Sequence, residues 1–225
     1  MGSKNKLKRF KENDTFENVF QPTREELLEG NFKPKGNWNK NIFNNDNPIV
    51  LELGCGKGEY TVGLAKRYPN KNFIGIDIKG ARFWRGAKTA LEENIPNAKF
   101  IRTQIELIDH VFAENEVNEI WITFPDPQIK YTRTKHRLTN AEFLKKHHTI
   151  LKPDGVVNLK TDSEFMHGYT LGLLHGAGHE VLYAHHDIYK NFESPKEVTS
   201  TQTFYESQYL EQGKPITYIK FKIKQ

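Results

Sequence analysis

The chain has 225 residues, of which 36% are hydrophobic, and a formal net charge of +5. This length predicts one domain, or one domain with an appendage, that buries a sizeable core. No apolar run approaches the roughly 18 residues of a transmembrane helix, the basic N-terminus lacks the apolar stretch of a secretory signal, and the single Cys55 excludes an internal disulfide. We therefore expect a cytoplasmic protein with no membrane partner, and the basic excess favours a polyanionic partner without requiring one.

Residues 1–47 differ in composition from the rest of the chain. Lysine and arginine dominate residues 1–11, which contain no acid, and six of the eleven residues 37–47 are asparagine. Turn formers and charges of this kind, with weak apolar periodicity, predict a partly disordered extension. One short helix is expected near 24–29, with Thr23 as its N-cap and Glu26 at the capping-box position.

From Pro48 onward, apolar runs alternate between the strand and helix patterns. We predict strands at 48–53, 72–78, 98–103, 118–124, 156–161, 179–188 and 216–223, and helices at 59–69, 81–94, 140–153 and 163–178. This alternation predicts right-handed βαβ units, and so a mostly parallel seven-stranded sheet of the α/β class with helices on both faces. No clear helix separates the last two strands, which favours a terminal antiparallel hairpin. Residues 48–225 would form this one domain.

A glycine-rich loop follows the first predicted strand. In "LELGCGKGEY", Glu52 precedes three glycines, Gly54, Gly56 and Gly58, which permit positive φ and a close approach of the backbone to a ligand. A dinucleotide fingerprint would need glycine or alanine at position 59. The carboxylate of Glu59 would instead repel a pyrophosphate at this helix N-terminus. The loop therefore suits a ligand without phosphates, and a dehydrogenase is disfavoured.

Acidic residues surround this loop. Asp77 ends the second predicted strand, where a carboxylate can accept hydrogen bonds from the two ribose hydroxyls of an adenosine. Together with Glu52 and Glu59 it makes the region around the glycine-rich loop acidic, and an acidic site attracts a cationic cofactor such as S-adenosylmethionine. Gln104, after the third predicted strand, is either an adenine contact or an ordinary polar residue at a helix start.

A proline-flanked acid followed by a basic loop ends the fourth predicted strand. The stretch "ITFPDPQIKYTRTKHRLT" runs from Ile122 to Thr139. The prolines beside Asp126 stiffen the turn and bias the acid toward an extended conformation. A carboxylate held there could orient a nucleobase and stabilise positive charge developing on it. The cations from Lys130 to Arg137 could contact RNA phosphates, although a solvated loop is an equally ordinary interpretation.

These motifs resemble a known family, the bacterial tRNA (guanine-N7-)-methyltransferases, which are class I S-adenosylmethionine-dependent enzymes. The resemblance covers about residues 48–224 and rests on "LELGCGKGEY", "GIDI", "FPDPQIKYTRTKHRL", "LKTD" and "TFYESQYLEQG". It implies a Rossmann-like class I methyltransferase fold and S-adenosylmethionine as the methyl donor. It also implies tRNA as the partner, with methylation at N7 of a variable-loop guanosine at position 46.

The resemblance also implies roles for individual residues. Catalysis falls to Asp126, whose expected part is orienting and electrostatic. The cofactor contacts implied are Glu52, Gly54, Gly56, Gly58, Asp77, Gln104 and Asp126. The substrate contacts implied are Lys130, Asp162, Thr203, Phe204, Tyr205 and Glu206. No metal is expected, because the paired histidines His147-His148 and His185-His186 point in different directions and lack cysteine neighbours.

Two positions depart from the family's pattern, and two other functions stay open. Family members often carry Trp where this chain has Gln128, and Asp or Asn where it has Gln104, which bears on base stacking and cofactor affinity. A class I methyltransferase with a protein or small-molecule substrate is one alternative. A non-catalytic RNA-binding protein with a degenerate cofactor fold is another, disfavoured by the intact glycines and acids. Monomer and homodimer are both compatible with the sequence.

Overall fold

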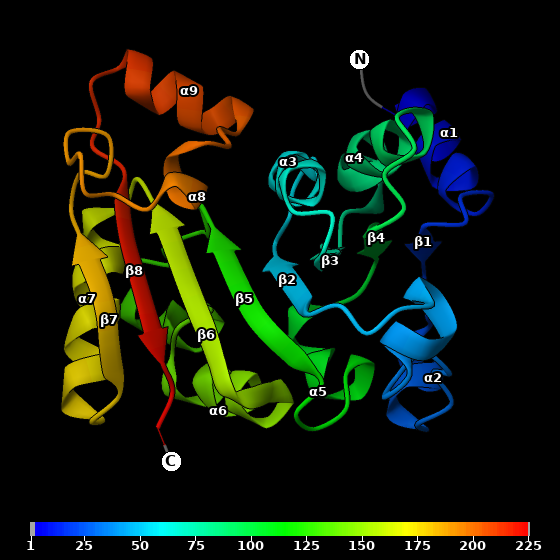
Figure 1. Ribbon diagram of the computed structural model, residues 1–225, viewed down its shortest axis with the longest axis horizontal. Coiled ribbons are helices and arrows are strands. Elements are labelled where there is room, and N and C mark those ends of the chain that lie inside the picture. The colour runs from blue at the N-terminus through cyan, green and yellow to red at the C-terminus, as the bar shows by residue number, and fades with distance from the viewer. Residues whose placement is uncertain (1–2, 225) are drawn as a thin grey trace.

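The computed structural model describes residues 3–224, and in this range the strands form one mixed sheet (Figure 1). The strands are β1 Val19–Phe20, β2 Ile49–Leu53, β3 Asn72–Ile76, β4 Ala98–Ile101, β5 Val117–Thr123, β6 Leu151–Thr161, β7 Glu180–His185 and β8 Thr217–Lys222. Their spatial order is β1-β4-β3-β2-β5-β6-β8-β7, and every neighbouring pair is parallel except the two pairs that β8 forms, with β6 and β7, which are antiparallel. The expected α/β class is confirmed, with eight strands in place of seven.

Helices connect these strands and cover both faces of the sheet. The α-helices are α1 Ser3–Asn13, α2 Arg24–Leu28, α3 Glu59–Arg67, α4 Gly80–Glu92, α5 Ile108–Val111, α6 Ala141–Ile150, α7 Glu164–Gly176, α8 Lys196–Thr199 and α9 Phe204–Glu211. A π-helix, η1, spans Trp38–Phe43, and two 3-10 helices, η2 and η3, span Ile105–Leu107 and Tyr131–His136. In the described range, no helix is long and apolar enough to cross a membrane.

Side chains of each strand alternate between two apolar layers, as a pleated strand requires. On β2, Ile49, Leu51 and Leu53 pack toward α2, α5, α6 and α7. Val50 points to the opposite layer, which α3, α4 and α8 cover. All five residues of β2 are buried. A strand buried on both faces reads as a continuous apolar run, which is why the sequence pattern located β2 correctly.

The N-terminal segment is more ordered than its composition predicts. Strand β1 pairs in parallel with β4, and the side chains of Leu27, Phe32 and Trp38 are buried in the main core. Two of the asparagines that predicted disorder are instead bonded to the sheet: Asn72, at the start of β3, donates to the side-chain oxygens of Asn39 at 2.9 Å and Asn45 at 2.7 Å. Residues 1 and 2 of the expected extension lie outside the described range. The division at residue 47 into extension and domain stays a prediction.

Two further expectations differ from the structure near the C-terminus. Helices α8 and α9 lie between β7 and β8, so these antiparallel strands are not joined by a tight hairpin. Helix α6 ends at Ile150, and Pro153 lies within β6, where the pairing with β5 shifts register. An irregular ladder tolerates a proline here because four residues of β6, 152–155, lie opposite one residue of β5 and so lack regular pairing partners.

Candidate active site at the carboxyl edge of the sheet

The parallel strands end at one edge of the sheet, where ligands bind in open α/β folds. In Figure 1 the arrowheads of β5, β6 and β7 point toward this edge, and α8 and α9 lie beyond it. The loops that follow β2, β3, β4 and β5 meet here. The sequence motifs singled out above therefore come together in space, although they are spread over more than a hundred residues of chain.

The glycine loop adopts the conformation that its composition predicts. Gly54, Gly56 and Gly58 have φ of 75°, 55° and 75°, a region that other residues rarely adopt. Gly58 is also the N-cap of α3, and a Cβ there would lie 2.6 Å from the ring of Phe100. Gly54 N–H and Cys55 N–H both donate to the Ile76 carbonyl, at 2.8 and 3.0 Å, which fixes the loop to β3.

Glu52 is buried beneath this loop and bonds within the protein. One carboxylate oxygen accepts from Thr61 N–H and Oγ1, at 2.9 and 2.5 Å, and the other accepts from Thr123 Oγ1 at 2.6 Å. Burial raises the pKa of this carboxyl to about 7, against the opposing effect of these hydrogen bonds. Glu52 thus ties β2 to α3 and β5. Sequence reasoning missed Thr61 and Thr123, because partners so distant in the chain leave no local pattern.

Asp77 lies beside the loop, at the rim of a cavity of about 240 Å³. Its carboxylate accepts from Gly56 N–H at 3.1 Å and from Lys79 N–H at 2.7 Å, one bond to each oxygen. Gly54 and Gln104 also line the cavity. The Gln104 carbonyl accepts from the Arg24 guanidinium at 2.8 Å, which leaves its amide N–H groups as the available donors.

The Phe-Pro-Asp-Pro turn is held in a strained conformation. Phe124 and Gln128, on either side of it, have φ of 47° and 46°, which costs a residue other than glycine about 1–3 kcal/mol. Between them Asp126 is exposed, and within residues 3–224 its carboxylate accepts a single hydrogen bond, from Gln128 N–H at 3.0 Å. Such strain persists when the surroundings over-determine the backbone, and it is common at functional sites.

Arg137 is hydrogen-bonded to the backbone at the end of this turn. Its guanidinium donates to the carbonyls of Gln128, at 3.0 and 3.1 Å, and Ile129, at 3.2 Å. It lies 4.4 Å from the ring centroid of Tyr169, and its side chain is only 5% exposed. Arg137, one of the loop cations that could contact RNA phosphates, is therefore buried in the protein and lacks the exposure that such a contact needs. Lys130, at the N-cap of η3, is exposed as expected.

The N-terminus of α9 is fastened over the glycine loop. The Glu59 carboxylate accepts from Phe204 N–H at 2.9 Å, and the Lys57 ammonium lies 3.9 Å from the Phe204 ring centroid. Phe204 and Tyr205 are 49% and 48% exposed and pack edge to face. These contacts place two accessible aromatic rings next to the cofactor loop. Sequence reasoning had given Glu59 no such partner.

Thr203 and Glu206 stabilise helix α9. They form the capping box of α9, and Glu206 is fully buried in an ion pair with Lys160, at 2.6 Å. Because the Glu206 side chain is 0% exposed, it lacks the surface access that a substrate contact requires. The N-cap of α7 is Ser163, so Asp162 lies just before this helix and does not cap it. Asp162 stays half-buried at the end of β6.

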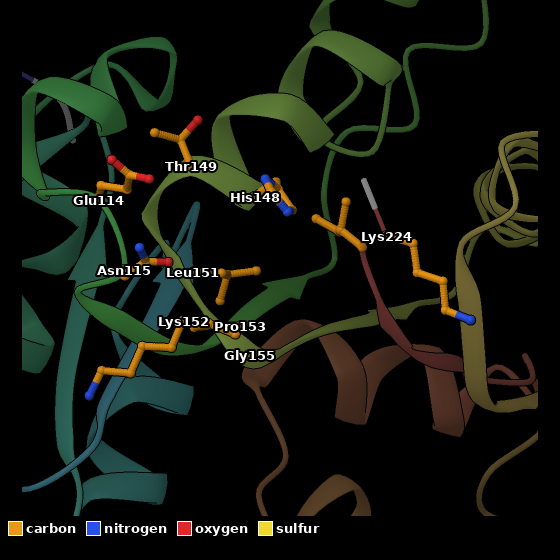
Figure 2. A pocket seen from close by; sticks show the side chains of 10 residues that line it. Glu114, Asn115, His148, Thr149, Leu151, Lys152, Pro153, Gly155 and Lys224 are labelled. Atoms are coloured by element: carbon orange, nitrogen blue, oxygen red, sulfur yellow. The ribbon is translucent and has the colours of Figure 1, made fainter.

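A larger cavity, of about 710 Å³, lies at the opposite edge of the sheet (Figure 2). Lys152, Pro153 and Gly155 line it from the start of β6, and Glu114 and Asn115 line it just before β5 begins. These are the amino-terminal ends of parallel strands, where this class of sheet does not build its ligand site. Size alone therefore does not identify the active site, and the smaller cavity beside Asp77 is the candidate.

Known proteins that resemble this chain are methyltransferases. A family model described as "Putative methyltransferase" matches residues 46–219. A tRNA (guanine-N(7)-)-methyltransferase of Christiangramia forsetii is 76% identical over 224 residues, covering 100% of both chains. The chain belongs to the tRNA (guanine-N(7)-)-methyltransferase family. A relative of the same name from Porphyromonas gingivalis is 50% identical over 92% of this chain and 85% of its own.

Solved structures place the fold of this methyltransferase among more distant enzymes. The 16S rRNA methyltransferase KamB superposes with a TM-score of 0.63 over 83% of this chain and 92% of its own, at 13% identity. A 30S ribosomal A1408 methyltransferase from an uncultured bacterium gives 0.56 over 82% and 92%, at 19% identity. At such low identity the likeness shows the fold alone, and this fold agrees with the class expected from sequence.

Proposed function

We propose that this methyltransferase transfers a methyl group from S-adenosylmethionine to N7 of guanosine 46 in the variable loop of tRNA. The observation that carries the proposal is the 76% identity, over the whole chain, to a protein named for this activity. The carboxyl-edge site supports it independently, because it combines a glycine loop, a cavity of about 240 Å³ lined by Asp77 and Gln104, and an exposed acid. Its single Cys55 is buried and free, as befits the reducing cytoplasm that we propose as its location.

The cavity residues fit the proposed cofactor. The Asp77 oxygens each hold one backbone N–H and keep a second lone pair for a ribose hydroxyl. The Gln104 amide can donate to the adenine edge, and the positive-φ glycines keep side chains away from the methionine portion. Glu52 contributes through the position of the loop, since both its oxygens already accept bonds from threonines. Bound S-adenosylmethionine would supply an electrophilic methyl group.

Asp126 is proposed to orient the base. Guanine N7 already carries an in-plane lone pair, so the protein need not create the nucleophile. The exposed carboxylate can accept hydrogen bonds from the N1–H and N2 amino groups of guanine, and favours the positive charge that the base gains on methylation. The strained turn and Arg137 fix this carboxylate in advance, so little reorganisation accompanies the reaction.

The remaining substrate contacts are proposed from position and exposure. Phe204 and Tyr205 can stack against bases of an opened loop, as aromatic side chains do with single-stranded RNA. Lys130, at the N-cap of η3, is exposed and can contact a phosphate. Asp162, which follows β6, and Thr203, the N-cap of α9, are the other proposed contacts. Glu206 acts through α9 and does not contact the substrate directly.

The test is methyl transfer from labelled S-adenosylmethionine to an unmodified tRNA transcript, followed by digestion to nucleosides. We expect 7-methylguanosine from the wild-type chain and a loss of about 10²-fold in kcat for Asp126→Ala, because an oriented electrostatic contact is removed. Asp154→Ala is the matched control, since that carboxylate is fully exposed at the opposite edge. Cofactor binding without any tRNA methylation would overturn the proposed substrate, and unchanged kcat in Asp126→Ala would overturn the role of Asp126.

A further inference from the structure

Helix α1 and the turn between β3 and α4 enclose a cavity of about 530 Å³ that the function proposed above does not use. Lys6 and Arg9 line it from α1, Lys79 and Arg82 from the start of α4, and Arg102 from the end of β4. No carboxylate is among its lining residues. We call this feature the α1–α4 groove. Its cations come from three separate segments, so they gather only in the folded chain.

The α1–α4 groove gathers cations that have no acidic partner among residues 3–224. In the described part of the chain, none of its five cationic side chains forms an ion pair, whereas Lys8, which is on α1 but does not line the groove, pairs with Glu12 at 3.8 Å. Glu12 also accepts from the Trp84 indole N–H at 2.6 Å. Like charges held together repel unless an anion neutralises them, so this surface favours an anionic ligand.

Helix α1 is fixed in place, so its cations are held toward the groove. Asn13, 1% exposed, donates to the Gly80 carbonyl at 2.9 Å and attaches the end of α1 to the start of α4. The Arg9 guanidinium lies 4.8 Å from the Trp84 ring centroid, and that of Arg102 lies 4.7 Å from the Phe10 ring centroid. A basic tail alone would order only on binding, whereas this groove is formed beforehand.

The position of the groove points to its ligand. Ile78 lines both the α1–α4 groove and the cavity beside Asp77, so the two hollows adjoin. On the η3 side, His136 reaches the same cavity. A nucleic acid whose base enters the active site would pass its backbone across such flanking surfaces. Arginine guanidinium groups match phosphate oxygens in a two-pronged geometry, and three of the five cations are arginines.

We propose that the α1–α4 groove binds phosphates of the tRNA backbone and positions the variable loop for methylation. The inference rests on the proposed function, since it names a second contact surface for the same substrate. The sequence places α1 in a partly disordered extension. This proposal instead gives α1 a direct role in substrate binding. Each engaged phosphate releases counterions, so the contribution is salt-dependent.

The experiment compares the full-length wild type with Lys6→Gln/Arg82→Gln, which removes one cation from each side of the groove. The matched control is Lys66→Gln/Lys145→Gln, with the same change in net charge at lysines that pair with Glu93 and Glu142 elsewhere. Binding of an unmodified tRNA transcript is titrated between about 50 and 300 mM salt, and kcat and KM for methylation are measured. All four substituted side chains are exposed, so stability should change little.

We expect the groove variant to flatten the slope of log affinity against log salt by about 1.4–1.8, and to raise KM about tenfold with little change in kcat. The control should match the wild type. If the wild type methylates tRNA and the groove variant matches the control, the groove assignment is wrong and the proposed function stands. If the wild type does not methylate tRNA, the proposed function fails, and the salt slopes still decide the groove. Loss of binding to anionic phospholipid vesicles, with tRNA binding unchanged, would also overturn the assignment.

Discussion

Glu52 carries the clearest consequence at the scale of a single residue, because its folded pKa differs from its unfolded value. Burial raises that pKa from 4.5 to about 7. Between these values the folded chain binds a proton that the unfolded chain has released, so the free energy of unfolding falls as pH rises. We expect the contribution of Glu52 to fall by roughly 3 kcal/mol between pH 4.5 and pH 7. Urea unfolding of the wild type and Glu52→Gln at pH 5 and pH 8 measures it.

Glu52→Gln keeps the shape of the side chain but cannot ionise, so its stability relative to wild type should rise between pH 5 and pH 8. Glu119→Gln is a suitable control, since it makes the same substitution at another mostly buried carboxylate, which pairs with Lys71 at 3.0 Å. An equal pH dependence in the wild type and Glu52→Gln would show that the carboxyl titrates normally in the folded chain.

The site residues also show which positions can be predicted from the sequence and which cannot. Local motifs located the glycine loop, Asp77 and Asp126, because each follows a strand end directly and carries its signal in neighbouring residues. Arg137 and Glu206 sit in equally polar stretches, yet the fold turns both inward. Their partners, Gln128 and Lys160, become neighbours only when η3 and α9 fold back on the sheet. Charge in a sequence does not say on which side of the surface a side chain lies.

Helix α9 depends as an element on the buried pair between Lys160 and Glu206. Lys160 also donates to the Val198 carbonyl at 2.5 Å, so one ammonium holds both α8 and α9 to β6. Removing one partner leaves a buried charge unpaired, which costs about 3–5 kcal/mol. We expect Glu206→Gln to speed hydrogen exchange at amides 196–211 while those of β5 and β6 stay protected. Glu211→Gln, exposed on the same helix, should exchange like the wild type.

Lys160→Met/Glu206→Leu tests whether the effect belongs to the pair. Replacing both charges with apolar groups removes the unpaired charge, so protection of 196–211 should return most of the way to the wild-type level. A double variant as exposed as the single one would mean that the loss comes from packing at these positions and not from the charge.

Elements were predictable where periodicity was strong. The strands buried on both faces and the helices α3, α4, α6 and α7 follow directly from apolar spacing. Strand β1 has two residues and α8 has four, too few for any period to register. Both are stabilised by tertiary contacts: β1 by pairing with β4, and α8 by Lys160 and the burial of Val198. Tertiary packing overrides local propensity in such short segments.

For the whole molecule, the N-terminal segment is expected to unfold together with the methyltransferase fold. Trp38 is fully buried, donates to the Val111 carbonyl at 3.2 Å and stacks on Phe112 with ring centroids 5.7 Å apart. Trp38→Ala should therefore lower the free energy of unfolding by about 3–5 kcal/mol in a single transition. Phe192→Ala, at a fully exposed ring, should stay within about 0.5 kcal/mol of wild type. Urea unfolding followed by circular dichroism compares them.

If Trp38→Ala leaves the main transition unchanged, or splits it in two, the N-terminal segment is an appendage. A single shifted transition makes residues 3–47 part of the fold that positions Arg24 against Gln104 and α1 against α4.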